Sequence, residues 1–231
     1  MFRLAKMYCY RLFRKKGIYM TCLLLAGFEF LIKMMLENGS VSEIFARVGT
    51  FYLLFSAIAP AMFFCTDIST GFIKNYAGTM PDRGLITGAR AIVAIVENII
   101  FMTAFTLTAL IVAKADLGDE SFLVYGGAAL FVAGVGMSFV SICVTELLRK
   151  TVASIVTMMV IGFGLAGQLV PSLIALITKI DTQPFFITCA VETMGNTQTM
   201  GDIVKTIAVS AGYIVCAYII SVVSIRKRDV V

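Results

Sequence analysis

Residues 67–90 read DISTGFIKNYAGTMPDRGLITGAR and form the longest polar interruption that also carries positive charge in a largely apolar chain. The start of this stretch is compatible with about two turns of helix. Gly78, Pro81 and Gly84 then break that helix, because glycine is entropically costly there and proline lacks an N–H donor. The stretch therefore predicts a short helix and a sharp turn held between two apolar segments, a shape suited to docking a second protein.

The composition indicates an integral membrane protein. Of the 231 residues, 59% are hydrophobic and 14% are charged, whereas soluble domains are about 25% charged. The chain has no histidine, so the commonest general base and metal ligand near neutral pH is missing. None of the six cysteines forms a Cys-x-x-Cys pair, and we expect buried apolar side chains rather than disulfides or a metal site.

Apolar runs of about 20 residues, long enough to cross a bilayer, recur along the chain. The predicted spans are 17–36, 45–66, 89–113, 122–144, 152–178 and 203–225. An even number of spans puts both termini on one side, and the segments on that side hold 14 of the 19 lysines and arginines. This bias predicts cytoplasmic termini. The expected fold is an all-α membrane protein, a single transmembrane domain over residues 1–231.

Two further segments are expected to lie at the membrane surfaces. Residues 1–16 gather their bases on about half of a helical wheel, which favours an amphipathic interfacial helix; flanking charges without a fixed helix are the alternative. Residues 179–202 are semi-apolar but too short to span. They are compatible with a re-entrant or surface-lying hairpin on the outer side, or with an ordinary extracellular loop.

Charged and amide side chains inside the spans are candidates for a translocation path, because such groups are costly in lipid. Glu29 and Lys33 stand at i and i+4, so they share a helix face and can pair. Glu97 lies beside Asn98 in the third span. A carboxylate there should face other helices or a wet cavity, either to bind a cationic group or as a protonated structural residue.

The fifth span combines small residues with a helix breaker. It contains Gly162, Gly164, Gly167 and Pro171, with Gln168 as a polar side chain that needs a partner in lipid. Glycines at these spacings permit close helix approach, and the proline permits a kink. A dimer seam or hinge and ordinary packing within the chain are both compatible with this pattern.

No enzyme signature is present in the sequence. The chain contains no Gly-x-Ser-x-Gly, His-Glu-x-x-His or P-loop pattern. We therefore expect no catalytic residues, no metal and no cofactor in this chain, and uphill transport would need a separate ATPase.

The layout resembles the membrane-spanning permease subunit of ABC-2-type transporters, found in many bacterial ABC exporters. The likeness covers essentially the whole chain and rests on a basic N-terminal helix, six spans, a basic tail and the loop after the second span. In that loop the family tends to show an acidic residue, a glycine, a basic-Asn-like pair and a Pro-x-Arg. Here these are Asp67, Gly71, Lys74, Asn75, Pro81 and Arg83. Arg90 replaces a lysine that the family often has.

The resemblance implies a cytoplasmic coupling loop over residues 67–88, a homodimer or heterodimer of permeases, and two ATP-binding-cassette subunits that bind ATP and Mg²⁺. It also implies outer re-entrant helices before the last span and a multi-pass location in a bacterial cell membrane, with lipids but no nucleic acid as partners. The expected cargo is a hydrophobic or amphipathic molecule such as a toxin, bacteriocin or antimicrobial peptide. Export of drugs or lipids, and an accessory or immunity protein without transport of its own, are the alternatives.

Overall fold

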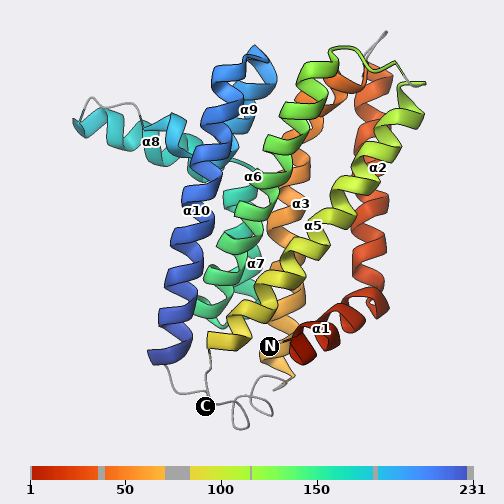
Figure 1. The fold of residues 1–231 in the computed structure, drawn as a ribbon. Coiled ribbons are helices and arrows are strands. Elements are labelled where there is room, and N and C mark those ends of the chain that lie inside the picture. The colour runs from red at the N-terminus through yellow and green to blue at the C-terminus, as the bar shows by residue number, and fades with distance from the viewer. Residues whose placement is uncertain (1, 36–39, 71–83, 115, 179–181, 228–231) are drawn as a thin grey trace.

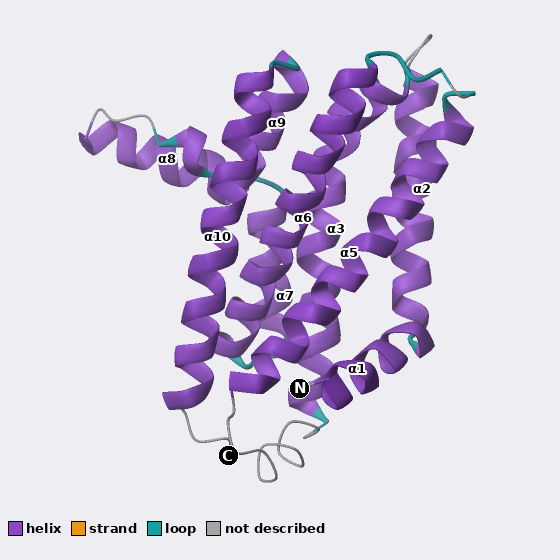
Figure 2. Ribbon diagram, viewed as in Figure 1, coloured by secondary structure: helices purple, strands orange, loops and turns teal. Residues whose placement is uncertain are grey.

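The computed structural model describes residues 2–35, 40–70, 84–114, 116–178 and 182–227. Within these ranges the chain is helical apart from short turns, and Figure 2 shows no strand there. The elements are α1 Phe2–Arg14, α2 Lys16–Met35, α3 Val41–Ser69, α5 Gly84–Val112, α6 Glu120–Leu148, α7 Thr151–Gly162, α8 Leu165–Thr178, the 3₁₀ turn η1 Gln183–Phe185, α9 Ile187–Thr197 and α10 Met200–Lys227. The all-α prediction is confirmed for this part of the chain.

Five of the described helices are long and apolar enough to cross a membrane. They are α2, α3, α5, α6 and α10, and each lies within a few residues of a predicted span. The helices α7 and α8 form a sixth span only if they are taken together, because they are bent by 71° at the break between them. The described residues therefore contain five helices that could span a membrane, or up to six, where the sequence predicts six spans.

The predicted span at 152–178 is broken into two helices at one of its predicted hinge residues. With 12 residues, α7 rises only about 18 Å, less than the ~30 Å hydrocarbon core of a bilayer. Gly164 lies at the break with a φ of +77°, a left-handed conformation that glycine adopts without the Cβ clash of other residues. Pro171, the other predicted breaker, lies inside α8 and does not make the bend. Figure 1 shows α8 leaving the bundle sideways while α7 lies within it.

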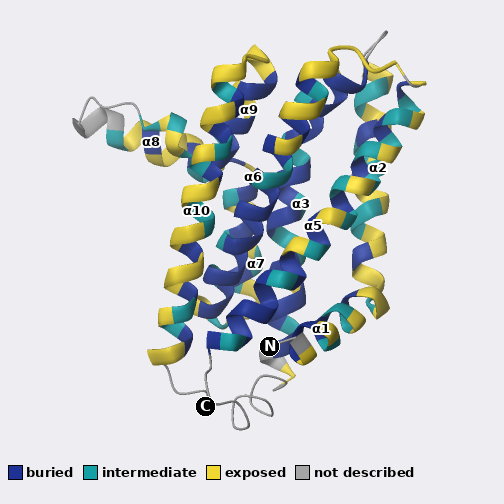
Figure 3. Ribbon diagram, viewed as in Figure 1, coloured by how far each residue is buried: buried dark blue, intermediate teal, exposed yellow. Residues whose placement is uncertain are grey.

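The core of the bundle is formed mainly by α3 and α6. Figure 3 shows these two helices as largely buried, while α2 and α10 expose much of their surface at the perimeter. Tyr52 and Leu53 of α3 and Leu130 of α6 are fully or almost fully buried. Large apolar side chains such as Leu23 and Phe30 of α2 are exposed, as expected where the surrounding solvent is hydrocarbon.

The N-terminal helix α1 uses its apolar face against the bundle. Leu4, Tyr8 and Leu12 recur every four residues and are buried, which is the spacing of one helix face. Exposed bases lie elsewhere on the helix, together with Tyr10 and Phe13, which are 65% and 50% exposed. The predicted helix over residues 1–16 is therefore present, but the side that packs on the protein is its apolar stripe.

The segment before the last span is also helical where it is described. Helix α9 buries Ile187, Val191 and Met194, and Thr206 of α10 donates a hydrogen bond to the Ala190 carbonyl oxygen at 3.1 Å. A Cβ added at Gly195 would meet the Ala46 carbonyl oxygen at 2.6 Å, so α9 also approaches α3 closely. The described part of residues 179–202 therefore contains a helix packed beside α10, and differs in this from the ordinary extracellular loop that was one of the two predicted alternatives.

Candidate functional site

The described ends of the polar stretch at 67–90 lie at the same end of the bundle as α1 and the last turns of α10 (Figure 1). Asp67 lies in the last turn of α3, and Arg90 lies near the start of α5. The other predicted coupling residues fall outside the described residues: Gly71, Lys74, Asn75, Pro81 and Arg83. The described geometry therefore concerns the two ends of the predicted coupling loop.

The first end is fixed by an ion pair between α1 and α3. Arg11 Nη2 lies 2.6 Å from Asp67 Oδ1, with the Asp67 side chain fully buried and the Arg11 side chain 25% exposed. A carboxylate buried at the end of a span needs a cationic partner to offset its desolvation. Arg11 supplies that partner, so the predicted coupling residue Asp67 also attaches the N-terminal helix.

The second end is fixed by an ion pair between α5 and α6. Arg90 Nη1 lies 3.1 Å from Glu146 Oε1, and both side chains are buried. The Thr87 hydroxyl donates to the same carboxylate oxygen at 3.2 Å. The Arg90 guanidinium also lies 5.2 Å from the ring centroid of Phe64 on α3, within the range of a cation–π contact.

Tyr8 of α1 lies near both ion pairs, since Arg90, Asp67 and Arg11 all act electrostatically on its hydroxyl. Its ring contacts the rings of Phe63 and Phe64, at centroid distances of 6.2 Å and 6.3 Å. Burial raises the pKa of its hydroxyl, while the nearby Arg90 cation acts in the opposite direction. We call these side chains the charge cluster: Tyr8, Arg11, Asp67, Arg90 and Glu146.

Lys15 adds a further positive charge near the charge cluster, at the junction of α1 and α2. Its Nζ lies 4.5 Å from the ring centroid of Phe63. Burial lowers the pKa of this ammonium group, an effect opposed first by Asp67 and less by Glu97. The α1–α2 junction is therefore electrostatically linked both to the charge cluster and to the third predicted span.

The charge cluster ties four helices together at the two ends of the predicted coupling loop. Asp67 is bound to α1, and Arg90 is bound to α6 and packs on α3. Buried ion pairs resist separation, since each partner left alone would be an uncompensated charge. A displacement of either end of the loop should therefore be passed to α1, α3, α5 and α6 together.

Sequence reasoning missed Glu146 as a site residue and treated Arg90 only as a flanking base. Glu146 stands near the end of an apolar run beside Thr145, so it could have been read as a cytoplasmic flank. The signal available in the sequence was an acidic residue just after the apolar run of the predicted span 122–144. Its partner is 56 residues away and is not indicated by helical spacing.

Asn98 lies in a closed polar network in the core. The Tyr52 hydroxyl donates to Asn98 Oδ1 at 3.2 Å. Asn98 Nδ2 donates to Ser138 Oγ at 2.7 Å, and Ser138 Oγ donates to the Ser56 carbonyl oxygen at 2.8 Å. The network links α3, α5 and α6 and gives Asn98 its partners, so this predicted path residue has a structural role.

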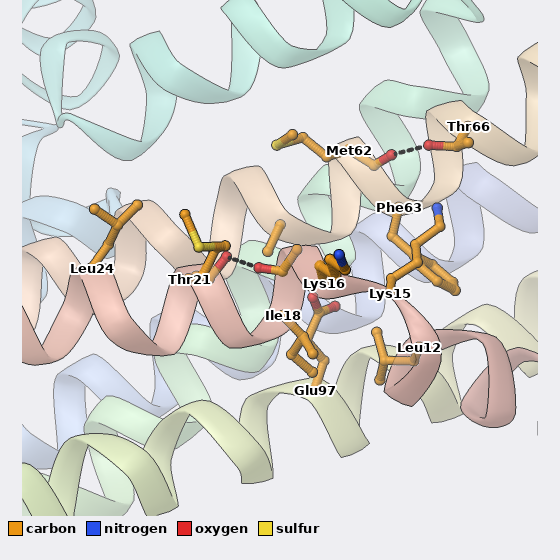
Figure 4. A pocket seen from close by; sticks show the side chains of 13 residues that line it. Leu12, Lys15, Lys16, Ile18, Thr21, Leu24, Met62, Phe63, Thr66 and Glu97 are labelled. Carbon is orange, nitrogen blue, oxygen red and sulfur yellow. Dashed lines mark hydrogen bonds between the residues drawn. The ribbon is translucent and has the colours of Figure 1, made fainter.

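Glu97 is in a different environment from its neighbour. It is 2% exposed, and its Oε2 atom has no hydrogen-bond partner among the described residues. It lines a cavity of about 460 Å³ at the α1–α2 junction. Figure 4 shows the Glu97 side chain directed from α5 toward that junction.

Glu29 is fully buried on the bundle side of α2. Neither of its carboxylate oxygens makes a hydrogen bond within the described part of the chain. The predicted pairing with Lys33 is therefore not seen as a hydrogen bond, and Glu29 is a second buried acid.

The glycines of the fifth predicted span allow close packing against other helices of the same chain. A Cβ added at Gly162 would meet Leu54 Cδ1 at 2.9 Å, and one at Gly167 would meet Thr188 Oγ1 at 2.7 Å. These close approaches bring α7 against α3 and α8 against α9. Gly164 provides the hinge conformation, while Gln168 is exposed on α8.

The described residues contain no group of three or more His, Cys, Asp or Glu side chains that could hold a metal ion. The six cysteines are free thiols. What the cluster offers chemically is a set of paired charges, most of them buried.

No family model matches this chain, and no curated protein matches it.

Proposed function

We propose that this chain is the membrane-spanning permease subunit of an ATP-driven exporter, with ATP and Mg²⁺ bound by two separate ATP-binding-cassette subunits. The observation that carries the proposal is the charge cluster, which holds both ends of the 67–88 segment by buried ion pairs. An ATPase docked on that segment would act on α3 through Asp67 and on α5 through Arg90. The chain itself would then need no catalytic residue.

We assign the cluster end of the bundle to the cytoplasm. Exposed bases at that end include Arg3, Lys6 and Arg14 of α1 and Lys150 between α6 and α7. Excess lysine and arginine on the cytoplasmic side is the general rule for membrane proteins. In this orientation α1 lies in the headgroup region, with its exposed bases on anionic lipid and with Tyr10 and Phe13 at the interface.

The functional unit would contain two permease copies in a bacterial cell membrane. The Tyr52, Asn98 and Ser138 network occupies the space between α3, α5 and α6, so a cargo path through one copy would have to break it. A path between two copies would leave it intact. The apolar perimeter favours a hydrophobic or amphipathic cargo, with a toxin, bacteriocin or antimicrobial peptide as the first choice, and drugs or lipids as the alternatives.

The test is affinity purification of the chain co-expressed with its candidate ATPase. Wild type is compared with the double variant Asp67→Ala, Arg83→Ala. The control is the double variant Glu192→Ala, Lys205→Ala, which removes an exposed acid and an exposed base far from the cluster. We expect the ATPase to co-purify with wild type and the control, and to be lost or uncoupled in the first variant. If folded wild type captures no ATPase, the permease proposal fails and the accessory or immunity alternative replaces it.

A further inference from the structure

The cavity beside Glu97 combines a buried acid, two bases and an apolar wall. It is lined by α1, α2, α3 and α5 and has a volume of about 460 Å³, within the ~300–1,000 Å³ range of small-molecule sites. Lys15 and Lys16 line it at the α1–α2 junction, and Glu97 lines it from α5. Each kind of group recognises a different part of a ligand.

The acid is positioned to accept a hydrogen bond. Glu97 Oε2 is buried without a hydrogen-bond partner among the described residues, and such an atom is costly unless a donor reaches it. Glu97 acts electrostatically on the Lys15 ammonium group. The Lys15 Nζ nevertheless lies over the Phe63 ring. The hydroxyl of Thr21, which also lines the cavity, donates to the Gly17 carbonyl oxygen at 2.9 Å and keeps its oxygen as an acceptor.

The apolar wall faces the perimeter of the bundle. Met20, Leu24 and Met62 line the cavity and are each more than half exposed. They belong to α2 and α3, so the cavity opens between these helices onto the surface that hydrocarbon would cover. A ligand that enters this way must carry an apolar tail.

We propose that this cavity binds the headgroup of a bilayer phospholipid that carries both a primary ammonium group and a phosphate, as phosphatidylethanolamine does. The ammonium donates to Glu97 Oε2 and Thr21 Oγ1, the phosphate lies against Lys15 and Lys16, and an acyl chain lies along Met20, Leu24 and Met62. The two lysines disfavour a purely cationic amphiphile, and Glu97 disfavours a purely anionic lipid. A trimethylammonium headgroup has no N–H donor to give to Glu97.

The test is lipid binding to the purified full-length chain in detergent, measured by native mass spectrometry. Phosphatidylethanolamine, phosphatidylcholine and phosphatidylglycerol with the same acyl chains are compared. We expect wild type to bind phosphatidylethanolamine about tenfold or more tightly than the other two, and Glu97→Gln to remove most of that preference, because it deletes one partner of a desolvated charge pair. Lys16→Gln should weaken all three lipids, and Lys205→Gln, at an exposed base of α10 outside the cavity, should weaken none.

A second variant fills the cavity without changing its charges. A Cβ added at Gly17 meets no atom within 4 Å, and Gly17 lines the cavity. Gly17→Leu should therefore fold and exclude the headgroup, while Gly27→Leu, at an equally open glycine of α2, should bind as wild type does. Equal affinity of wild type for the three lipids, or a preference that survives both Glu97→Gln and Gly17→Leu, overturns the proposal.

A soluble competitor identifies the source of the headgroup. Glycerophosphoethanolamine carries the same charges without acyl chains, and we expect it not to displace the lipid at equal concentration. Full displacement would mean that the apolar wall contributes nothing, which contradicts a bilayer lipid as the occupant. No ATPase is needed, so failure of this test leaves the proposed function untouched.

Discussion

At the scale of single residues, the Arg90–Glu146 ion pair is the feature on which the cluster end of the bundle most depends. Both side chains are buried and lie 3.1 Å apart. Arg90→Met alone, or Glu146→Leu alone, should lower the free energy of unfolding by about 3–5 kcal/mol, because the remaining charge is left buried. The double variant Arg90→Met, Glu146→Leu should recover most of this loss, since a buried pair can be replaced by apolar side chains at little cost.

Thermal unfolding of the four proteins in detergent, followed by the loss of monodisperse protein, measures this coupling. The single-variant midpoints should fall well below that of wild type, and the double variant should lie close to it. Additive losses in the double variant would contradict a direct interaction between Arg90 and Glu146.

Gly134 is the second residue with a predicted effect on stability. A Cβ added there would meet Tyr52 Cε1 at 2.5 Å and Asn98 Oδ1 at 2.7 Å. Gly134→Ala should therefore destabilise the protein by about 1–3 kcal/mol through overpacking of the polar network. Gly127→Ala on the same helix is the control, because its nearest neighbour is Phe45 Cε1 at 3.4 Å. Equal unfolding midpoints for the two variants would show that the network tolerates displacement.

At the scale of helices, the start of α6 carries a pH-dependent cap. Asp119 Oδ1 accepts hydrogen bonds from the Ser121 hydroxyl at 2.7 Å and from the backbone N–H groups of Ser121 and Phe122 at 3.0 Å and 3.3 Å. The Ser121 hydroxyl first, and then the Phe122 N–H, hold the pKa of the Asp119 carboxyl below its usual range. The ionised carboxylate is therefore the form that stabilises the helix start.

The sign of the pH effect follows from this depressed pKa. The stabilisation is fully present above the ordinary aspartate pKa and is lost as the pH falls through the lower pKa of the folded protein. Unfolding midpoints of wild type and Asp119→Ala should therefore converge under acid conditions and differ at neutral pH. Asp119→Asn, which keeps the acceptor oxygen but cannot titrate there, should retain part of the cap without that pH dependence. A wild-type to Asp119→Ala difference that is constant with pH would contradict the assignment.

The break between α7 and α8 is the second prediction at this scale. Gly164 has a φ of +77°, and the nearest atoms to an added Cβ are 3.7 Å away on Thr188. Gly164→Ala should therefore cost about 1–2 kcal/mol from backbone conformation alone, since there is room for the methyl group. Gly212→Ala in α10, where the added Cβ meets no atom within 4 Å, should instead be neutral or stabilising. A stabilised Gly164→Ala variant would mean that the helix can continue through the break.

The positions of the helices could largely be predicted from the sequence, because apolar runs of membrane-spanning length are a strong local signal. The runs at 17–36 and 122–144 correspond to α2 and α6 with small shifts at their ends. The local sequence did not indicate which glycine would interrupt the helix predicted at 152–178, because the spacing of Gly162, Gly164 and Gly167 does not distinguish one from another. Their different roles depend on the neighbours that α3 and α9 provide.

The candidate site could be predicted only in part, for the same physical reason. Asp67 and Glu97 stand out as charges in or beside apolar runs, and both are buried. Their surroundings depend on tertiary packing: Arg11 comes from the N-terminal helix, and the cavity beside Glu97 needs four helices. Glu29 and Lys33, four residues apart, looked like a pair, yet the Glu29 oxygens make no hydrogen bond within the described residues.

At the scale of the whole molecule, the described bundle has one end rich in buried ion pairs and a broad apolar perimeter. The ion pairs join α1 to α3 and α5 to α6, so the helices at that end should move as a unit. The perimeter on α2 and α10 exposes large side chains such as Tyr19, Leu23 and Ile219, which suits contact with lipid or with a second copy. The proposed exporter uses the first feature for coupling and the second for assembly.

The central claim is that the Arg11–Asp67 ion pair carries movement between a docked ATPase and the spans. ATP hydrolysis by the ATPase, reconstituted in lipid with wild type, Arg11→Asp, Asp67→Arg and the charge-swapped double variant, tests it directly. Each single variant should reduce permease-dependent hydrolysis about tenfold, or ~1.4 kcal/mol. The double variant should restore it, and Arg3→Asp, at an exposed base of α1, should leave it unchanged. Wild-type hydrolysis rates in both single variants, with the ATPase still bound, would contradict the claim.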